Sequence, residues 1–196
     1  MIDWRLYVIV NATHRDPVGL AEAAIRGGAG VIQLRDKRGD TRAMMALAKQ
    51  LLAVCGDTPL IINDRVDVAL AVGAAGVHVG PNDMPVADVR RLAPDLLIGA
   101  STGTPMDAQW LVEAGADYLG SGAVFDASAS KPDAVHNRGI DALAAVVAAV
   151  DVPVVGIGGI DESNVHLVRS TGAAGIAIIR AVADADDPEA AAQRLL

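Results

Sequence analysis

A short glycine-alanine motif recurs four times along the chain, and its spacing limits the folds that the chain can form. The copies are Gly28-Ala-Gly-Val, Gly73-Ala-Ala-Gly-Val, Gly115-Ala-Asp-Tyr and Gly172-Ala-Ala-Gly-Ile. Each copy lies between a predicted helix and the apolar run after it. Glycine at such a position caps the helix C-terminus and permits a tight connection to the next strand. The motif therefore predicts a fold built from repeated helix–strand units.

Apolar and β-branched runs alternate with helical periodicity along the whole sequence. We expect eight strands, each followed by a helix, at Leu6–Val10, Val31–Arg35, Pro59–Asn63, Gly76–Gly80, Leu97–Ser101, Tyr118–Gly120, Pro153–Ile157 and Gly175–Ile179. The closing helix is expected at Glu189–Leu196. This order is typical of an α/β fold of the (β/α)₈ TIM barrel type. An open doubly wound sheet is the alternative, but it does not predict the fourfold recurrence, so we favour one barrel domain over residues 1–196.

Composition supports this fold and narrows the class of ligand. Hydrophobic residues make up 52% of the chain but aromatic residues only 3%, so Ala, Val, Leu and Ile must form the core. Such a core suits parallel strands that are buried on both faces. The net charge of −8 argues against nucleic acid or an anionic membrane as a partner. A small anionic ligand would need local lysines or arginines, a metal ion or helix N-termini.

The single cysteine and the first ten residues indicate the cellular compartment of the protein. The single cysteine, Cys55, lies in an apolar helical pattern, and we interpret it as a buried structural thiol and not a nucleophile. One cysteine also fits a reducing compartment. The segment Met1–Val10 has no basic region before its apolar run, so we interpret it as a strand and not a signal peptide. We therefore expect a cytoplasmic protein without a membrane span; a homo-oligomer stays open.

Polar residues follow the ends of the predicted strands, where barrels carry their active sites. In chain order the candidate residues at these ends, which also include three glycines and one isoleucine, are Gln33, Arg35, Lys37, Asn63, Asp64, Asn82, Asp83, Ser101, Ser128, Ser130, Lys131, Gly156, Gly158, Gly159, Ile179 and Arg180. Asp64 and Asp83, on neighbouring loops, can hold one Mg²⁺ with water and phosphate oxygens completing its octahedron. The alternative is that each aspartate caps the helix after it.

The other candidates also have two interpretations each. Gly156–Gly159 before a helix matches the place where barrels bind phosphate on backbone N–H groups, although glycine-rich turns are frequent. Arg35 and Lys37 could neutralise a diphosphate or lie on a solvated loop. His78 is expected to be a hydrogen-bonded core histidine, with its direction undetermined. The serines and Lys131 of the long loop after strand six form either an anion site or a solvated surface loop.

Six stretches, in one order along nearly the whole chain, resemble the thiamine phosphate synthase family. They are QLRDK at Gln33–Lys37, INDRVDVAL at Ile62–Leu70, GVHVGPNDMPV at Gly76–Val86, IGAST at Ile98–Thr102, ADYLGSGAVF at Ala116–Phe125 and PVVGIGGI at Pro153–Ile160. The resemblance implies a transferase that joins a hydroxymethylpyrimidine diphosphate to a thiazole phosphate carboxylate. The products would be thiamine phosphate, pyrophosphate and CO₂. Pyrophosphate would depart first, leaving a pyrimidinyl-methyl cation that the thiazole nitrogen captures.

The resemblance also implies roles for the candidate residues. The pyrimidine diphosphate would be held by Gln33, Arg35, Lys37, Asn63, Ser101 and Lys131, of which Arg35, Ser101 and Lys131 would be catalytic. The metal ligands would be Asp64 and Asp83, with Mg²⁺ as the cofactor. The thiazole phosphate would be received by Ser128, Ser130, Gly158, Gly159, Ile179 and Arg180.

Four positions depart from the pattern of this family and keep two alternatives open. The loop Asp126–Lys131 is one residue longer than the family's Pro-Thr-x-Thr-Lys, and Arg180 stands where serine is usual. Asn11 follows Val10 where Thr-Asp is common. His136–Gly139 resembles the related thiazole tautomerases, but Ala123 replaces a histidine that those isomerases carry. A tautomerase and a non-catalytic binder of thiamine phosphates are therefore the alternatives to a synthase.

Overall fold

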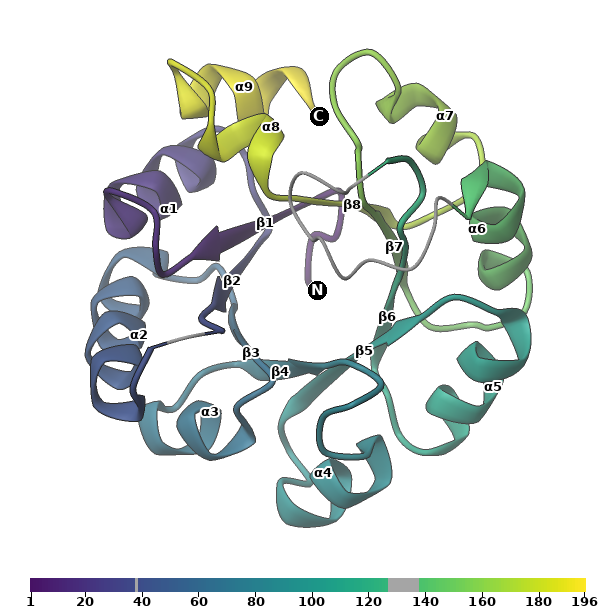
Figure 1. The fold of residues 1–196 in the computed structure, drawn as a ribbon, viewed down its shortest axis with the longest axis horizontal. Helices are drawn as coiled ribbons and strands as arrows, with labels where there is room; N and C mark the ends of the chain where they lie inside the picture. The colour runs from purple at the N-terminus through teal and green to yellow at the C-terminus, as the bar shows by residue number, and fades with distance from the viewer. Residues whose placement is uncertain (38, 127–137) are drawn as a thin grey trace.

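The computed structural model describes residues 1–37, 39–126 and 138–196, and these residues form a closed barrel with helices around it (Figure 1). The eight strands are β1 (Leu6–Asn11), β2 (Val31–Arg35), β3 (Leu60–Asn63), β4 (Gly76–Val79), β5 (Leu97–Thr102), β6 (Tyr118–Gly122), β7 (Val154–Ile157) and β8 (Gly175–Ile178). Neighbours in sequence pair in parallel, and β8 closes on β1. The barrel prediction is confirmed.

A helix follows each strand on the outside of the barrel. The helices of the described residues are α1 (Pro17–Arg26), α2 (Thr41–Cys55), α3 (Val66–Val72), α4 (Val86–Leu92), α5 (Pro105–Glu113), α6 (Gly139–Val147), α7 (Val165–Arg169), α8 (Arg180–Ala183) and α9 (Pro188–Arg194). The end of the chain differs from the expectation, because the short α8 precedes the closing helix. Asp187 caps α9 by accepting a hydrogen bond from Ala190 N at 3.0 Å, and Pro188 occupies the first turn.

Side chains of the strands alternate between two cores, as the period of a β-strand requires. The outer core lies between the sheet and the helices and includes Val8, Leu34 and Ile62. The inner core fills the barrel with Tyr7, Ile9, Val31, Ile61, Tyr118, Val155 and Ala177. Cys55 lies in the outer core as a free thiol, and burial raises its pKa to about 11, as the structural interpretation predicted.

Strand register decides which polar residues share the inside of the barrel. Gln33 pairs with Ile9 of the inner core, and Asn63 pairs with His78. His78 in turn pairs with Gly99, two residues before Ser101 on β5. Gln33, Asn63, His78 and Ser101 therefore all point inward near the carboxyl ends of their strands.

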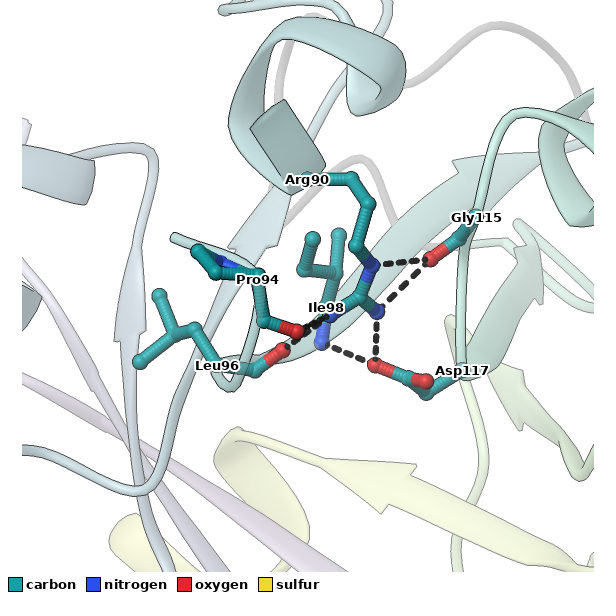
Figure 2. A network of polar contacts seen from close by, with 6 residues as sticks. All are labelled: Arg90, Pro94, Leu96, Ile98, Gly115 and Asp117. Atoms are coloured by element: carbon teal, nitrogen blue, oxygen red, sulfur yellow. Dashed lines mark hydrogen bonds and ion pairs between the residues drawn. The ribbon is translucent and has the colours of Figure 1, made fainter. Parts of the chain in front are cut away.

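The opposite end of the barrel is held by a polar network around Arg90 of α4 (Figure 2). The Arg90 guanidinium donates to Pro94 O at 2.7 Å, to Leu96 O at 2.9 Å and to Gly115 O at 2.8 Å. It also pairs with Asp117 at 2.6 Å, and the same carboxylate accepts a bond from Ile98 N at 2.7 Å. One side chain thus ties α4 to the starts of β5 and β6.

The glycines of the repeat behave as the sequence predicts. Gly28, Gly73, Gly115 and Gly172 have φ angles of 98°, 72°, 106° and 81°, in the left-handed region that favours glycine.

Among the residues that the structure describes, no helix is both long and apolar enough to cross a lipid bilayer.

Candidate active site

Two cations from the β2 end lie across the mouth of the barrel. The Arg35 side chain is half-buried and donates to Asn11 Oδ1, at the end of β1, at 3.2 Å. Lys37 forms an ion pair with Asp64, which follows β3. Both cations therefore bond to polar groups at neighbouring strand ends along the rim.

Asp64 and Asp83 lie next to each other, and neither caps a helix. The helices after them, α3 and α4, begin directly after their N-cap residues, Arg65 and Pro85. Neither helix has a side-chain hydrogen bond that caps its start. Instead Asp83 accepts a bond from Gly80 N at 2.8 Å, within its own loop. Burial and the neighbouring Asp64 carboxyl raise the pKa of Asp83. The helix-cap alternative is therefore wrong, and the pair forms a site that a cation would stabilise.

The donor set of this pair fits a hard divalent cation. The described residues contain no group of three or more His, Cys, Asp or Glu side chains that could enclose a metal. Two carboxylates at a barrel mouth leave the other positions of an octahedron to water and to ligand phosphates, which is the arrangement that Mg²⁺ favours. Lys37 supplies the positive charge next to Asp64 in this structure.

Asn63 adds an unsatisfied donor beside the aspartates. Its side chain is only 7% exposed, and its Nδ2 atom is buried without a hydrogen-bond partner in the described part of the chain. A buried amide donor without an acceptor costs about 1–3 kcal/mol, so such groups usually face a ligand or an ordered water. Because Asn63 lies at the end of β3, its unsatisfied donor favours an anionic ligand in the mouth of the barrel.

The floor of the mouth is a chain of hydrogen-bonded side chains from five strands. Gln33 Nε2 donates to Tyr7 Oη at 2.6 Å, and Tyr7 Oη lies 2.9 Å from Tyr118 Oη. Tyr118 Oη lies 3.1 Å from His78 Nδ1, and His78 Nε2 lies 2.9 Å from Ser101 Oγ. His78 is thus a hydrogen-bonded inward histidine, and Gln33 and Ser101 stand at the two ends of the floor.

The glycine turn after β7 differs in part from the prediction. Gly158 and Gly159 have φ angles of 104° and 64°, but α7 begins only at Val165, so the turn does not open directly into a helix. A Cβ on Gly159 would lie 2.5 Å from Asp126 O, and one on Gly158 would lie 2.7 Å from the Ala123 Cβ. These glycines therefore let the loop after β6 pack closely against the turn.

Arg180 lies at the start of α8, where it pairs with Asp184 at 2.7 Å. Arg180, Asp184 and Ile179 line a hollow of about 650 Å³ together with Asn11 and residues 13–15 of the loop after β1. The substitution of arginine for the usual serine therefore places a guanidinium beside the mouth, with its charge partly neutralised by its own helix.

Three predicted site residues, Ser128, Ser130 and Lys131, lie outside the described residues. Tyr7, Tyr118 and Asn11 were not predicted as site residues. Tyr7 bonds to Gln33 and Asn11 to Arg35, whereas Tyr118 bonds to Tyr7 and to His78, which was expected to be a core histidine. The alternation of side chains along β1 is the signal that could have found Tyr7. Tyr7 lies two residues before Ile9, and Ile9 pairs with Gln33. Residues on one strand that are separated by two positions share a face of the sheet.

Fold and site together define a class of protein. A closed (β/α)₈ barrel with two cations, a carboxylate pair and an unsatisfied amide at the carboxyl ends of its strands is the arrangement of a barrel enzyme for phosphorylated substrates. The family model described as thiamine monophosphate synthase matches residues 6–182. The chain belongs to this family.

Relatives and solved structures agree with that assignment. The chain is 48% identical to the thiamine-phosphate synthase of Chloroflexus aurantiacus, over 100% of this chain and 92% of the relative. It is 47% identical to the thiamine-phosphate synthase of a Roseiflexus species, over 97% and 83%. A solved structure, thiamine phosphate pyrophosphorylase from Pyrococcus furiosus, superimposes with a TM-score of 0.91 at 40% identity, over 99% of this chain and 94% of that one.

Proposed function

We propose that the chain condenses 4-amino-2-methyl-5-hydroxymethylpyrimidine diphosphate with the thiazole phosphate carboxylate, with Mg²⁺ held by Asp64 and Asp83. The family match and the relatives support a transferase that forms thiamine phosphate and pyrophosphate. The Mg²⁺ site and the roles of the individual residues rest on the geometry of the mouth. A dissociative displacement needs positioning and charge stabilisation, and it needs no strong base or nucleophile.

The observation that carries the metal assignment is the carboxylate pair with Lys37 beside it. Asp64 and Asp83 lie close enough to interact, do not cap helices and already attract a cation. When bound there, Mg²⁺ would offset the negative charge that grows on the departing pyrophosphate. Lys37 and Arg35 would then hold the phosphate oxygens from the side of β2.

The remaining residues divide between the two substrates. Asn63, with its unsatisfied Nδ2, would donate to a diphosphate oxygen. Gln33 and Ser101, at the ends of the floor, would hold the pyrimidine ring, and Lys131 would grip the diphosphate. The thiazole phosphate would lie near Gly158, Gly159, Ile179 and Arg180, and Ser128 and Ser130 would bind it as well. The hollow beside Ile179 and Arg180 supports that placement.

The test is thiamine phosphate formation from the two purified substrates, with and without Mg²⁺. We expect product only with Mg²⁺, and we expect Asp64→Asn to lower kcat/KM by about a hundredfold, since charge stabilisation by a metal contributes several kcal/mol. Asparagine is the right replacement because residue 64 has a φ of 62°, which asparagine tolerates.

Asp67→Asn is the matched control, because Asp67 is an exposed neighbour that pairs with Arg65 at 2.6 Å. Its kinetics and its Mg²⁺ dependence should equal those of the parent protein. Turnover that needs no metal, or equal losses in both variants, would overturn the metal assignment. Absence of product from a folded chain that binds the diphosphate would overturn the transferase itself.

A further inference from the structure

Two buried tyrosines that the proposed function does not use connect the two ends of the floor. Tyr7 and Tyr118 are 1% and 0% exposed, and their hydroxyls bond to each other at 2.9 Å. Tyr7 also bonds to Gln33, and Tyr118 to His78. A continuous path of hydrogen bonds therefore runs from an amide on β2 to an imidazole on β4 through the centre of the barrel.

The number of protons on this path fixes its direction. Three links join Gln33 Nε2, Tyr7 Oη, Tyr118 Oη and His78 Nδ1. The amide nitrogen of Gln33 can only donate, so its proton fills the first link. The Tyr7 proton then fills the second link, and the Tyr118 proton fills the third. A hydrogen bond holds one proton, so Nδ1 of His78 must be an acceptor.

The tautomer of His78 follows from that count, and it decides what Ser101 can do. A neutral imidazole that accepts at Nδ1 carries its proton on Nε2. Nε2 lies 2.9 Å from Ser101 Oγ, so this proton is donated to the serine oxygen. The Ser101 hydroxyl must then turn its own proton elsewhere, and Ser101 points inward near the end of β5.

We propose that Tyr7 and Tyr118 are positioning residues that make Ser101 a hydrogen-bond donor and Gln33 an acceptor toward the substrate ring. The bond from Nε2 to Tyr7 fixes the orientation of the Gln33 amide, so its side-chain oxygen is the atom that can accept a hydrogen bond from a ligand. The floor thereby presents the side-chain oxygen of Gln33 as a hydrogen-bond acceptor and the hydroxyl of Ser101 as a hydrogen-bond donor. The ligand class that fits is a heteroaromatic ring that carries both a hydrogen-bond donor and a hydrogen-bond acceptor. The inference rests on the proposed function for the identity of that ring.

The barrel makes room for this path at two glycines. A Cβ on Gly99 would lie 2.1 Å from Tyr118 Cζ and 2.4 Å from its hydroxyl. A Cβ on Gly120 would lie 3.2 Å from His78 Cε1. Trp4 covers Tyr118 from below, with ring centroids 4.5 Å apart. Burial also raises the pKa of both tyrosines, so the hydroxyls keep the protons that the count requires.

The direct test is the tautomer of His78, measured by two-bond ¹H–¹⁵N correlation on the full chain labelled with ¹⁵N-histidine. His78→Asn identifies the signals. The parent protein should show the proton on Nε2 and none on Nδ1, whether or not substrate is present. A proton on Nδ1, or equal amounts of both tautomers, would overturn the proposal.

Two variants separate the roles of the tyrosines. Tyr118→Phe removes the donor to Nδ1, so the Nε2 tautomer should lose its dominance. Tyr7→Phe leaves Tyr118 to donate, so the tautomer should persist while the Gln33 amide becomes free to turn. Both variants should raise KM for the pyrimidine diphosphate about tenfold, the effect of one lost hydrogen bond that orients a polar group, and leave KM for the thiazole phosphate within about twofold.

Thr102→Val is the matched control for both variants. Thr102 is buried on the same strand as Ser101 but on the other face, and its hydroxyl donates to Thr104 O at 3.2 Å. This variant should change neither the tautomer nor the KM ratio. A tautomer shift in Tyr118→Phe without any change in KM would overturn the positioning role. A chain that forms no thiamine phosphate but keeps the Nε2 tautomer would refute the proposed function and leave the path intact.

Discussion

Replacing Arg90 by alanine should destabilise the barrel without changing its chemistry. The variant removes five hydrogen bonds, which end on three carbonyl oxygens and the Asp117 carboxylate (Figure 2). The side chains of Arg90 and Asp117 are 28% and 39% exposed, so hydrogen bonds to water replace part of the bonding that the variant loses. A discounted contribution of about 0.5–1 kcal/mol for each bond gives a loss of about 3 kcal/mol. In a chain of this size, that corresponds to a fall in Tm of about 6–12 °C.

The assay is urea unfolding followed by tryptophan fluorescence, with kcat and KM measured in parallel. Arg91→Ala is the matched control, since Arg91 is the next residue of α4, is 78% exposed and pairs with Asp88 across one helical turn. That variant should change the free energy of unfolding by less than about 0.5 kcal/mol. Equal stability of the two variants would refute the view that the network ties α4 to β5 and β6. A fall in kcat for folded Arg90→Ala would refute the separation of this end from the mouth.

Three further predictions address the inner core, the thiol and the second substrate. Gly99→Ala should lower the free energy of unfolding by about 1–3 kcal/mol in a urea titration, because its methyl group would collide with the Tyr118 ring. Cys55 should resist iodoacetamide at pH 8 in the native protein and react in urea, because burial raises the pKa of its thiol to about 11; rapid native labelling would contradict this. Arg180→Ser should change KM for the thiazole phosphate and not KM for the pyrimidine diphosphate, since Arg180 and Asp184 line the hollow beside the mouth; a change confined to the pyrimidine substrate would contradict the placement.

The fold could be predicted because its determinants are local. A glycine with positive φ at the end of a helix, as at Gly73 and Gly115, is required by the αβ turn itself and repeats wherever that turn repeats. The closing segment could not be predicted in the same way. The helix α8 has only four residues and no side-chain cap, so neither periodicity nor a capping pattern marked its start at Arg180.

The sequence predicts which charged side chains meet at the rim of the barrel, but not the partner to which each of them bonds. The position of a residue after a strand is enough to bring Lys37, Asp64 and Asp83 to one rim, because all carboxyl ends of a parallel barrel meet there. Whether an aspartate caps a helix or faces the mouth depends on where that helix begins, and α4 begins behind Pro85.

The direction of the hydrogen bonds in the floor depends on contacts that cross the barrel. Tyr7 and Tyr118 are separated by 111 positions in the chain, and only closure of the barrel brings their hydroxyls together. The donor or acceptor character of Ser101 is then decided two hydrogen bonds away, at the Tyr118 hydroxyl, because the proton that Tyr118 donates to His78 excludes the reverse direction of that link. Such a property belongs to the path and not to any residue in it. A sequence pattern that evaluates Ser101 by its own position therefore cannot assign it.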